Sequence, residues 1–316
     1  MLPFYLVGQN NKCFEIEANS SAIQDLNIFS KYVNVLDCIH IYAEQSVSDA
    51  KMFHVASIAA ELLDNNEDGI IDDLNVQNQL LSVYTIMPIF SDEGSSAEDI
   101  LFDNFDNLIN DYNFCAGAVL YNNEIDPSSP GFWSNDASVE EILHTINNCS
   151  HIEIYPNVFG LNPNSSQMSD AMDVARGGQF LTIPIQYPEE GWYHYDDWTC
   201  DYQCMSMEYL YWSIVANMGL LDNSFICAGI YNEWELCTPE DFESIDVLMH
   251  AIITNPQYQM PQIAPDGNYC QNSIISDRDS VNKSIIKVID ILGRENNLFL
   301  HFEIYDDGSV EKKYIF

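Results

Sequence analysis

Arg176 is the only lysine or arginine between positions 52 and 277 of the chain. Over all 316 residues, 10 Lys and Arg stand against 49 Asp and Glu, and the net charge is -39. An acidic side chain in an apolar segment of this stretch therefore has no basic partner nearby in the sequence. Because burying an unpaired carboxylate costs on the order of several kcal/mol, something else must compensate each acid that the fold buries.

The acidic composition also limits the partners and the location of the chain. It argues against nucleic acid and against anionic membrane surfaces, and no apolar run is long enough for a membrane-spanning helix. The start of the chain, MLPFYLVGQN, lacks the pattern of a secretory signal, but nine cysteines favour an oxidising, extracellular location with up to four disulfides. We expect a secreted monomer that acts on a small-molecule or peptide substrate.

Hydrophobic patterning predicts strands and helices in alternation up to a helix that begins near Ser138. Alternating β-branched runs predict strands, and apolar residues at helical spacing predict helices. The strands are expected at 32–44, 82–90 and 113–121, and the helices at 48–63 and 97–109. Later helices are expected at 169–178, 196–219 and 238–254, followed by a terminal β-hairpin at 298–316 with an Asp-Gly turn. Ser138 and Glu141 have the spacing of a capping box.

The segment DNNEDGIIDDLN, residues 64–75, places oxygen-bearing side chains at regular intervals around a glycine. It resembles an EF-hand or dockerin-type calcium loop. That resemblance implies Ca²⁺ ligands at Asp64, Asn66, Asp68, Ile70, Asp72 and Asn75. Asn75 stands where a bidentate Glu is usual, so weak affinity is expected. The alternative is an Asx-rich turn that holds itself by side-chain to backbone hydrogen bonds.

The segment VEEILHTINNCSH, residues 139–151, puts two acids and two histidines into an apolar helix. Its EEILH core resembles the HExxH helix of the zincin metallopeptidases, with Glu140 in place of the first His. The resemblance implies Zn²⁺ or Fe²⁺ bound by Glu140 and His144, with Glu141 as general base. Glu208, in a later aromatic-rich run, resembles the third ligand of the gluzincins. His151 is the rival ligand, since it resembles the extended metzincin site.

Three further residues are candidates for substrate binding. Asp197 and Asp201 are expected on the same helical face as Glu208, where they could line a cleft. Arg176 is expected either to form an ion pair with Asp173, Asp196 or Asp197, or to bind a substrate carboxylate. Cys200 and Cys204, four residues apart on the expected helix, are predicted to form disulfides with separate partners.

These motifs together predict an α+β, zincin-like domain in which a mixed sheet precedes the metal-site helices. The expected parts are an N-terminal segment at 1–30, a core at 31–265 with its calcium loop at 64–75, and a hairpin extension at 266–316. The motifs also resemble a group of secreted microbial and marine proteins without an assigned activity, from which no function follows.

The expected function is metal-dependent hydrolysis, in which metal-activated water attacks a peptide or ester carbonyl and Glu141 takes its proton. One alternative is a non-catalytic, acidic calcium-binding matrix protein. Another is a metal-dependent enzyme that uses oxygen, of the oxygenase or luciferase type.

Overall fold

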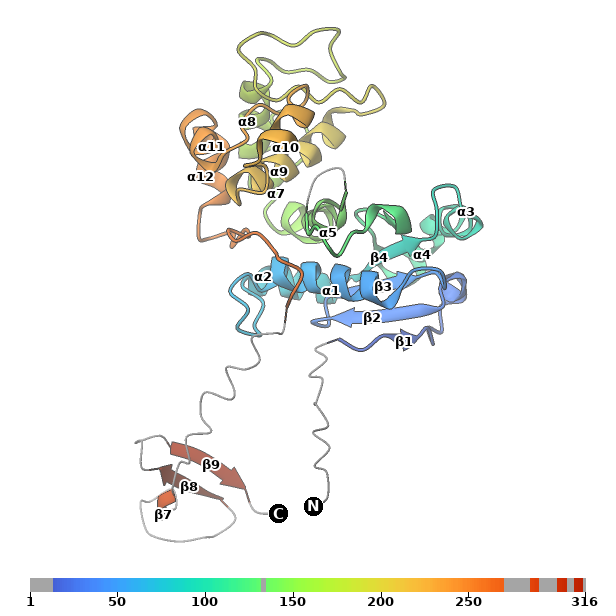
Figure 1. Cartoon of the computed structure of the whole chain (residues 1–316), viewed down its shortest axis with the longest axis vertical. Helices are drawn as coiled ribbons and strands as arrows, with labels where there is room; N and C mark the ends of the chain where they lie inside the picture. The colour runs from blue at the N-terminus through green and yellow to red at the C-terminus, as the bar shows by residue number, and fades with distance from the viewer. Residues whose placement is uncertain (1–13, 132–134, 270–284, 290–299, 306–309, 315–316) are drawn as a thin grey trace, which may run out of the picture. The chain divides into compact units, whose positions relative to one another are not determined.

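The structure, a computed structural model, describes residues 14–131, 135–269, 285–289, 300–305 and 310–314 (Figure 1). The chain divides into two units, Met1–Cys270 and Gln271–Phe316, and each is considered by itself. The first unit combines a mixed sheet with many helices, as an α+β fold requires. The α+β class is therefore confirmed, whereas the zincin-like fold stays a prediction.

The sheet begins with a tight hairpin rather than with the single strand expected at 32–44. Strands β2 (Lys31–Val35) and β3 (Ile39–Ala43) pair antiparallel, and β1 (Glu17–Ala18) pairs with the outer edge of β2. Leu36 and Asp37 both have positive φ, at 50° and 61°, in the turn between β2 and β3. A turn of this kind fits the twist of a hairpin.

Strand β4 (Tyr84–Phe90) lies parallel to β3 and confirms the strand expected at 82–90. The strand expected at 113–121 is interrupted: β5 (Phe114–Cys115) and β6 (Leu120–Tyr121) each pair with β4. Side chains on β4 alternate between two cores. Met87 and Ile89 belong to one core, and Ile86 and Phe90 belong to the other.

Helices cover both faces of the sheet. Helix α1 (Asp49–Leu63), begun by Ser48 as N-cap, matches the expected helix at 48–63, and α2 (Leu74–Ser82) follows it. The helix expected at 97–109 is two helices, α3 (Ser96–Asp103) and α4 (Phe105–Tyr112), which pack into the second core.

Helix α5 (Ser138–Ile146) lies between the sheet with α1 and the helices of the second half (Figure 1). The expected capping box is wrong, because Ala137 holds the N-cap position and Ser138 Oγ donates to Asp136 instead. A π-helical turn (Asn147–His151) and a short helix, α6 (Ile152–Ile154), continue the chain.

The second half of the first unit is helical. Its helices are α7 (Pro156–Phe159), α8 (Gln167–Ala175), α9 (Tyr202–Asn217), α10 (Ser224–Ile230), α11 (Pro239–Ile245) and α12 (Val247–Ile253). The helix expected at 238–254 is divided into α11 and α12 at Asp246, whose side chain caps α12. Helix α9 is nearly buried throughout and contacts α5, α8, α11 and α12.

Burial and hydrogen bonds define the two ends of the first unit. Leu26 and Phe29 are buried in the second core, so the chain from residue 14 belongs to the sheet domain. The backbone N–H groups of Asp266, Gly267 and Tyr269 donate to the buried carboxylate of Glu61 on α1. The first unit therefore extends to about residue 270.

The second unit is a three-stranded antiparallel sheet of β7 (Ile285–Ile289), β8 (Leu300–Tyr305) and β9 (Val310–Tyr314). The predicted hairpin is β8 and β9, and its Asp-Gly turn lies outside the described residues.

Among the described residues, three disulfides join Cys115 to Cys149, Cys200 to Cys204 and Cys227 to Cys237. They indicate an oxidising environment. Cys38 is free and buried, and Cys13 and Cys270 lie outside the described residues. Across the described part of the chain, no helix is both long and apolar enough to cross a membrane.

Candidate metal centre

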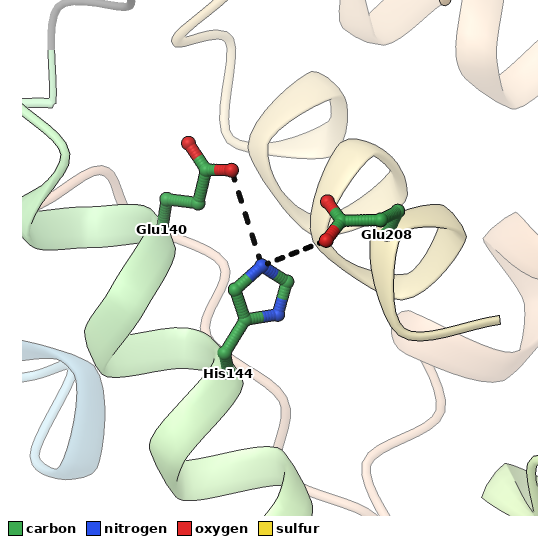
Figure 2. Close-up of side chains that lie close together, drawn as sticks. All are labelled: Glu140, His144 and Glu208. Carbon is green, nitrogen blue, oxygen red and sulfur yellow. Dashed lines mark ion pairs between the residues drawn. The ribbon is translucent and has the colours of Figure 1, made fainter. Parts of the chain in front are cut away.

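Helices α5 and α9 bring together Glu140, His144 and Glu208. Glu140 and His144 are one turn apart on α5, so both project from one face towards Glu208 on α9 (Figure 2). His144 Nε2 lies 3.5 Å from Glu208 Oε1 and 3.9 Å from Glu140 Oε1. The ligand atoms of all three residues lie within 4.8 Å of one another, and the described residues contain no other such group of His, Cys, Asp or Glu.

These separations suit ligation of one ion. A Zn²⁺ ion about 2.1 Å from each ligand of a tetrahedral site keeps the ligand atoms about 3.4 Å apart. The measured 3.5 Å and 3.9 Å are near that value, and 3.9 Å is too long for a hydrogen bond. The three residues thus have the donor types and the spacing of a metal-binding triad.

The position of His144 is fixed by the chain between β5 and β6. A Cβ on Gly117 would lie 2.5 Å from the carbonyl oxygen of His144, so only glycine allows the two backbones to approach this closely. The Cys115–Cys149 disulfide ties the same segment to the π-helical turn that follows α5. The interruption of the predicted strand at 113–121 thus brings Gly117 against α5, the helix that carries Glu140 and His144.

The electrostatics of the group show too many acids for one imidazole. Burial raises the pKa of Glu140 to about 7 and that of Glu141 to about 8. Burial alone would lower the pKa of His144, but the negative charge of Glu208, with smaller contributions from Glu141 and Glu140, raises it to about 9. Without another cation, the folded chain holds protons here that the same groups would release in water.

Two residues that the sequence did not indicate also belong to this site. Burial, followed by the charges of Asp196 and Glu208, raises the pKa of Glu233 to about 7. Tyr211 follows Glu208 by three residues on α9, and its ring centroid lies 5.7 Å from that of His144. Helical spacing from Glu208 could have identified Tyr211. Glu233 is brought near by the bridge between Tyr193 and Trp234, which no local pattern indicates.

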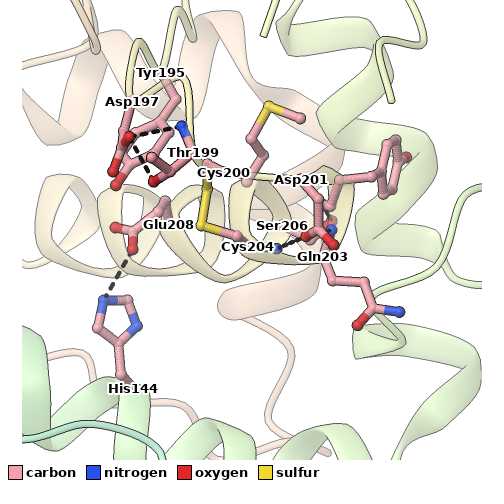
Figure 3. Close-up of a disulfide and its surroundings, with 12 residues drawn as sticks. His144, Tyr195, Asp197, Thr199, Cys200, Asp201, Gln203, Cys204, Ser206 and Glu208 are labelled. Carbon is pink, nitrogen blue, oxygen red and sulfur yellow. Dashed lines mark hydrogen bonds and ion pairs between the residues drawn. A yellow bond between two sulfur atoms is a disulfide. The ribbon is translucent and has the colours of Figure 1, made fainter. Parts of the chain in front are cut away.

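The segment before α9 differs from the prediction (Figure 3). Helix α9 begins at Tyr202, so Asp197 is not on the helix, and Asp201 is its N-cap and accepts from Gln203 N and Cys204 N. Asp197 accepts from Thr199 N and Oγ1. Because Cys200 precedes the helix, it reaches Cys204 and the two form a disulfide, so the prediction of separate partners is wrong. Substrate binding by Asp197 and Asp201 stays a prediction.

His151 lies away from the triad. It is in the π-helical turn, its ring contacts Phe159 and Tyr155, and burial lowers its pKa to about 4. It lines a small cavity together with Asp73 and Asn147. The structure therefore groups Glu140, rather than His151, with His144 and Glu208.

The ion pair expected for Arg176 is not formed. Asp173 accepts from Tyr202 Oη and Gln179 Nε2, and Asp196 accepts from Asn232 Nδ2. Arg176 itself is completely buried at the end of α8 and donates from Nη1 to the carbonyl oxygen of Phe180.

The loop at 64–75 is ordered by its own side chains. Asp64 accepts from Asp68 N and Gly69 N, and Asp68 accepts from Ile70 N. Gly69 has a φ of 88°, as the turn position of a calcium loop requires. Asn66 donates to Asp72, and Asn75 donates to Tyr155 Oη. Such side-chain to backbone bonds are those expected of the Asx-rich turn. They do not test the calcium loop, so calcium binding stays a prediction.

Comparison with known proteins gives no assignment, because no protein-family model, no curated protein and no solved structure matches the chain.

Proposed function

We propose that the chain is a secreted, calcium-stabilised hydrolase that uses a divalent metal ion held by Glu140, His144 and Glu208. The observation that carries the proposal is the convergence of these three ligand atoms within 4.8 Å, from two different helices. Zn²⁺ suits a mixed set of imidazole and carboxylate ligands, and Fe²⁺ accepts the same set.

Charge balance supports the same conclusion. Four carboxylates repel one another electrostatically at this site, and His144 is the one basic group among them. The four are Glu140, Glu141, Glu208 and Glu233. In the described part of the chain, no lysine or arginine forms an ion pair with any of the four. A dication would offset the repulsion that the fold otherwise relieves by protonation.

We assign Glu141 the role of general base, because its carboxylate interacts electrostatically with His144, Glu140 and Glu208. A bound divalent ion makes a water molecule more acidic and polarises a carbonyl group. The carboxylate of Glu141 would take the proton of that water and return it to the leaving group of a peptide or ester. Burial raises the pKa of Glu141, and a nearby dication would lower it again. The result would lie near neutral pH, where a general base works best.

The proposed calcium loop would stabilise the end of α1. Asp64, its first position, also accepts a hydrogen bond from Tyr269 Oη, so the loop is joined to the last residues of the first unit. The disulfides and the acidic composition are consistent with a calcium-rich medium outside the cell.

Metal analysis tests the proposal directly. We expect about one zinc or iron ion per chain in the purified wild type, and almost none in the variants His144→Ala and Glu208→Gln, which each remove one of three ligands. His250→Ala, a histidine on α12 outside the triad, should keep the wild-type content. A wild type that carries calcium alone would instead support the non-catalytic matrix protein.

Metal affinity should increase with pH. The metal must displace the proton of His144, whose pKa is about 9, so affinity should rise about tenfold per pH unit below that value for each proton displaced. The folding stability of the metal-free protein should instead decrease with pH. Its raised pKa values mean that the folded state binds more protons than the unfolded state, so its stability falls as pH rises from about 4.5 to about 9.

A competition titration with a chromophoric chelator, together with thermal unfolding of loaded and metal-free protein over this pH range, measures both trends. An affinity that does not change with pH would contradict ligation by His144.

A further inference from the structure

We propose that Arg176 anchors a second binding site, in which the free edge of its guanidinium binds the carboxylate of a small ligand beside the rings of Phe180 and Tyr187. The proposal does not rest on the metal centre. It rests on a charged side chain that is completely buried and that has too few partners.

The guanidinium donates from Nη1 to the carbonyl oxygen of Phe180 at 2.8 Å, and although burial raises the pKa of the Tyr187 hydroxyl, the charge of the guanidinium and a side-chain hydrogen bond lower it. Its Nε and Nη2 are buried and have no hydrogen-bond partner among the described residues. The remaining contacts are with the rings of Phe180 and Tyr187, whose centroids lie 5.3 Å and 5.6 Å from the guanidinium carbon. Arginine does not lose its proton in proteins, so the charge stays and needs an anion.

The described residues do not supply that anion. Asp173 is three residues before Arg176 on α8, but its two oxygens accept from Tyr202 and Gln179. No salt bridge to Arg176 is present within the described ranges. In a chain with 49 acidic residues, leaving its one central arginine unpaired points to an external partner.

The free atoms define the chemistry of that partner. Nε and Nη2 lie on the same edge of the guanidinium plane, and two parallel N–H groups match the two oxygens of a carboxylate. A single positive charge balances one carboxylate but not a doubly charged phosphate. The flanking rings favour a ligand with an apolar or aromatic body next to its carboxylate.

A strap of irregular chain, residues 177–191, covers the guanidinium. Trp192 N donates to the carbonyl oxygen of Ala175, which holds the two ends of the strap together. Phe180 and Tyr187 are half-buried, whereas Leu181 and Ile185 in the same strap are exposed. The strap contains no helix, so it can admit a ligand without loss of the helical core.

Ligand-dependent thermal unfolding of the full chain tests the proposal. Benzoate and N-acetyl-phenylalanyl-phenylalanine carry the same group as a free acid and as a peptide terminus, and benzamide and the peptide amide are their uncharged controls. At least one carboxylate should raise the unfolding temperature, and neither control should. Binding of benzoate alone would assign free acids, and binding of the peptide alone would assign peptide termini.

Variants locate the effect. Arg176→Met keeps the volume but removes the charge and should abolish the shift, and Arg176→Lys should weaken binding about tenfold or more because it lacks the paired N–H groups. Lys31→Met removes a half-buried cation on β2, which pairs with Asp49, and should bind like the wild type. If the purified site is already filled, denaturation should release a carboxylic acid from the wild type and not from Arg176→Met. No shift and no released acid would overturn the proposal.

Discussion

Glu141→Gln is expected to reduce hydrolysis by about 10²- to 10⁴-fold while the metal content stays at the wild-type level. Glutamine has the shape of glutamate but cannot accept a proton from water. Glu140, His144 and Glu208 are unchanged, so the proposed ligands remain complete. The measurement is turnover of a series of chromogenic esters and peptides by metal-loaded protein, with metal content determined on the same samples.

Glu153→Gln is the matched control for this variant. Glu153 is exposed on α6, just after the π-helical turn, so the change removes one negative charge from the same helical run without touching the triad. It should leave turnover unchanged. Equal turnover by Glu141→Gln and the wild type would remove Glu141 from the mechanism and leave the metal site without its proposed base.

The sequence predicted those elements that local patterns control. Helix α1 follows from an uninterrupted apolar spacing after Ser48, whose side chain accepts from Lys51 N. The hairpin of β2 and β3 could not be predicted, because its turn places Leu36 at positive φ, which Leu rarely adopts, and no glycine follows Asp37. The break between α11 and α12 at Asp246 has no local signal either. Asp246 accepts hydrogen bonds from Trp192 and Tyr209, which are distant in the sequence.

The grouping of Glu140, His144 and Glu208 could be predicted in part from charge and helical spacing. Glu140 and His144 are one turn apart, and Glu208 lies in an apolar run without a basic neighbour, so both segments needed a shared cation. The choice between Glu140 and His151 depended on the π-helical turn at Asn147–His151, which changes the direction of His151 relative to α5. Backbone geometry of that kind has no signature in the sequence.

Asp136→Ala is expected to destabilise the first unit by about 3–5 kcal/mol, because it removes one partner of a buried ion pair. Asp136 Oδ2 lies 2.8 Å from His54 Nε2 on α1, and both side chains are almost inaccessible to solvent. Asp136 also accepts from Gly131 N and from Ser138 Oγ at the start of α5. The substitution would leave these donors, of which His54 Nε2 and Ser138 Oγ are buried, without their acceptor between α1 and the helix that carries His144.

The pH dependence of the same pair has a definite sign. Burial would raise the pKa of Asp136, but the hydrogen bonds from His54 and Gly131 outweigh it and lower the pKa below its usual 3.8. The contribution of the pair is therefore present above about pH 4 and is lost as pH falls through the lowered pKa of the folded state.

Urea unfolding of wild type and Asp136→Ala, with disulfides intact, should show the two stabilities converging only in strong acid. Asp126→Ala removes a half-buried aspartate of the same loop, whose side chain accepts from Ser128, and should cost much less. A loss no greater than that of Asp126→Ala would mean that the start of α5 is held by packing alone, and that the alignment of His144 with Glu208 does not need the ion pair.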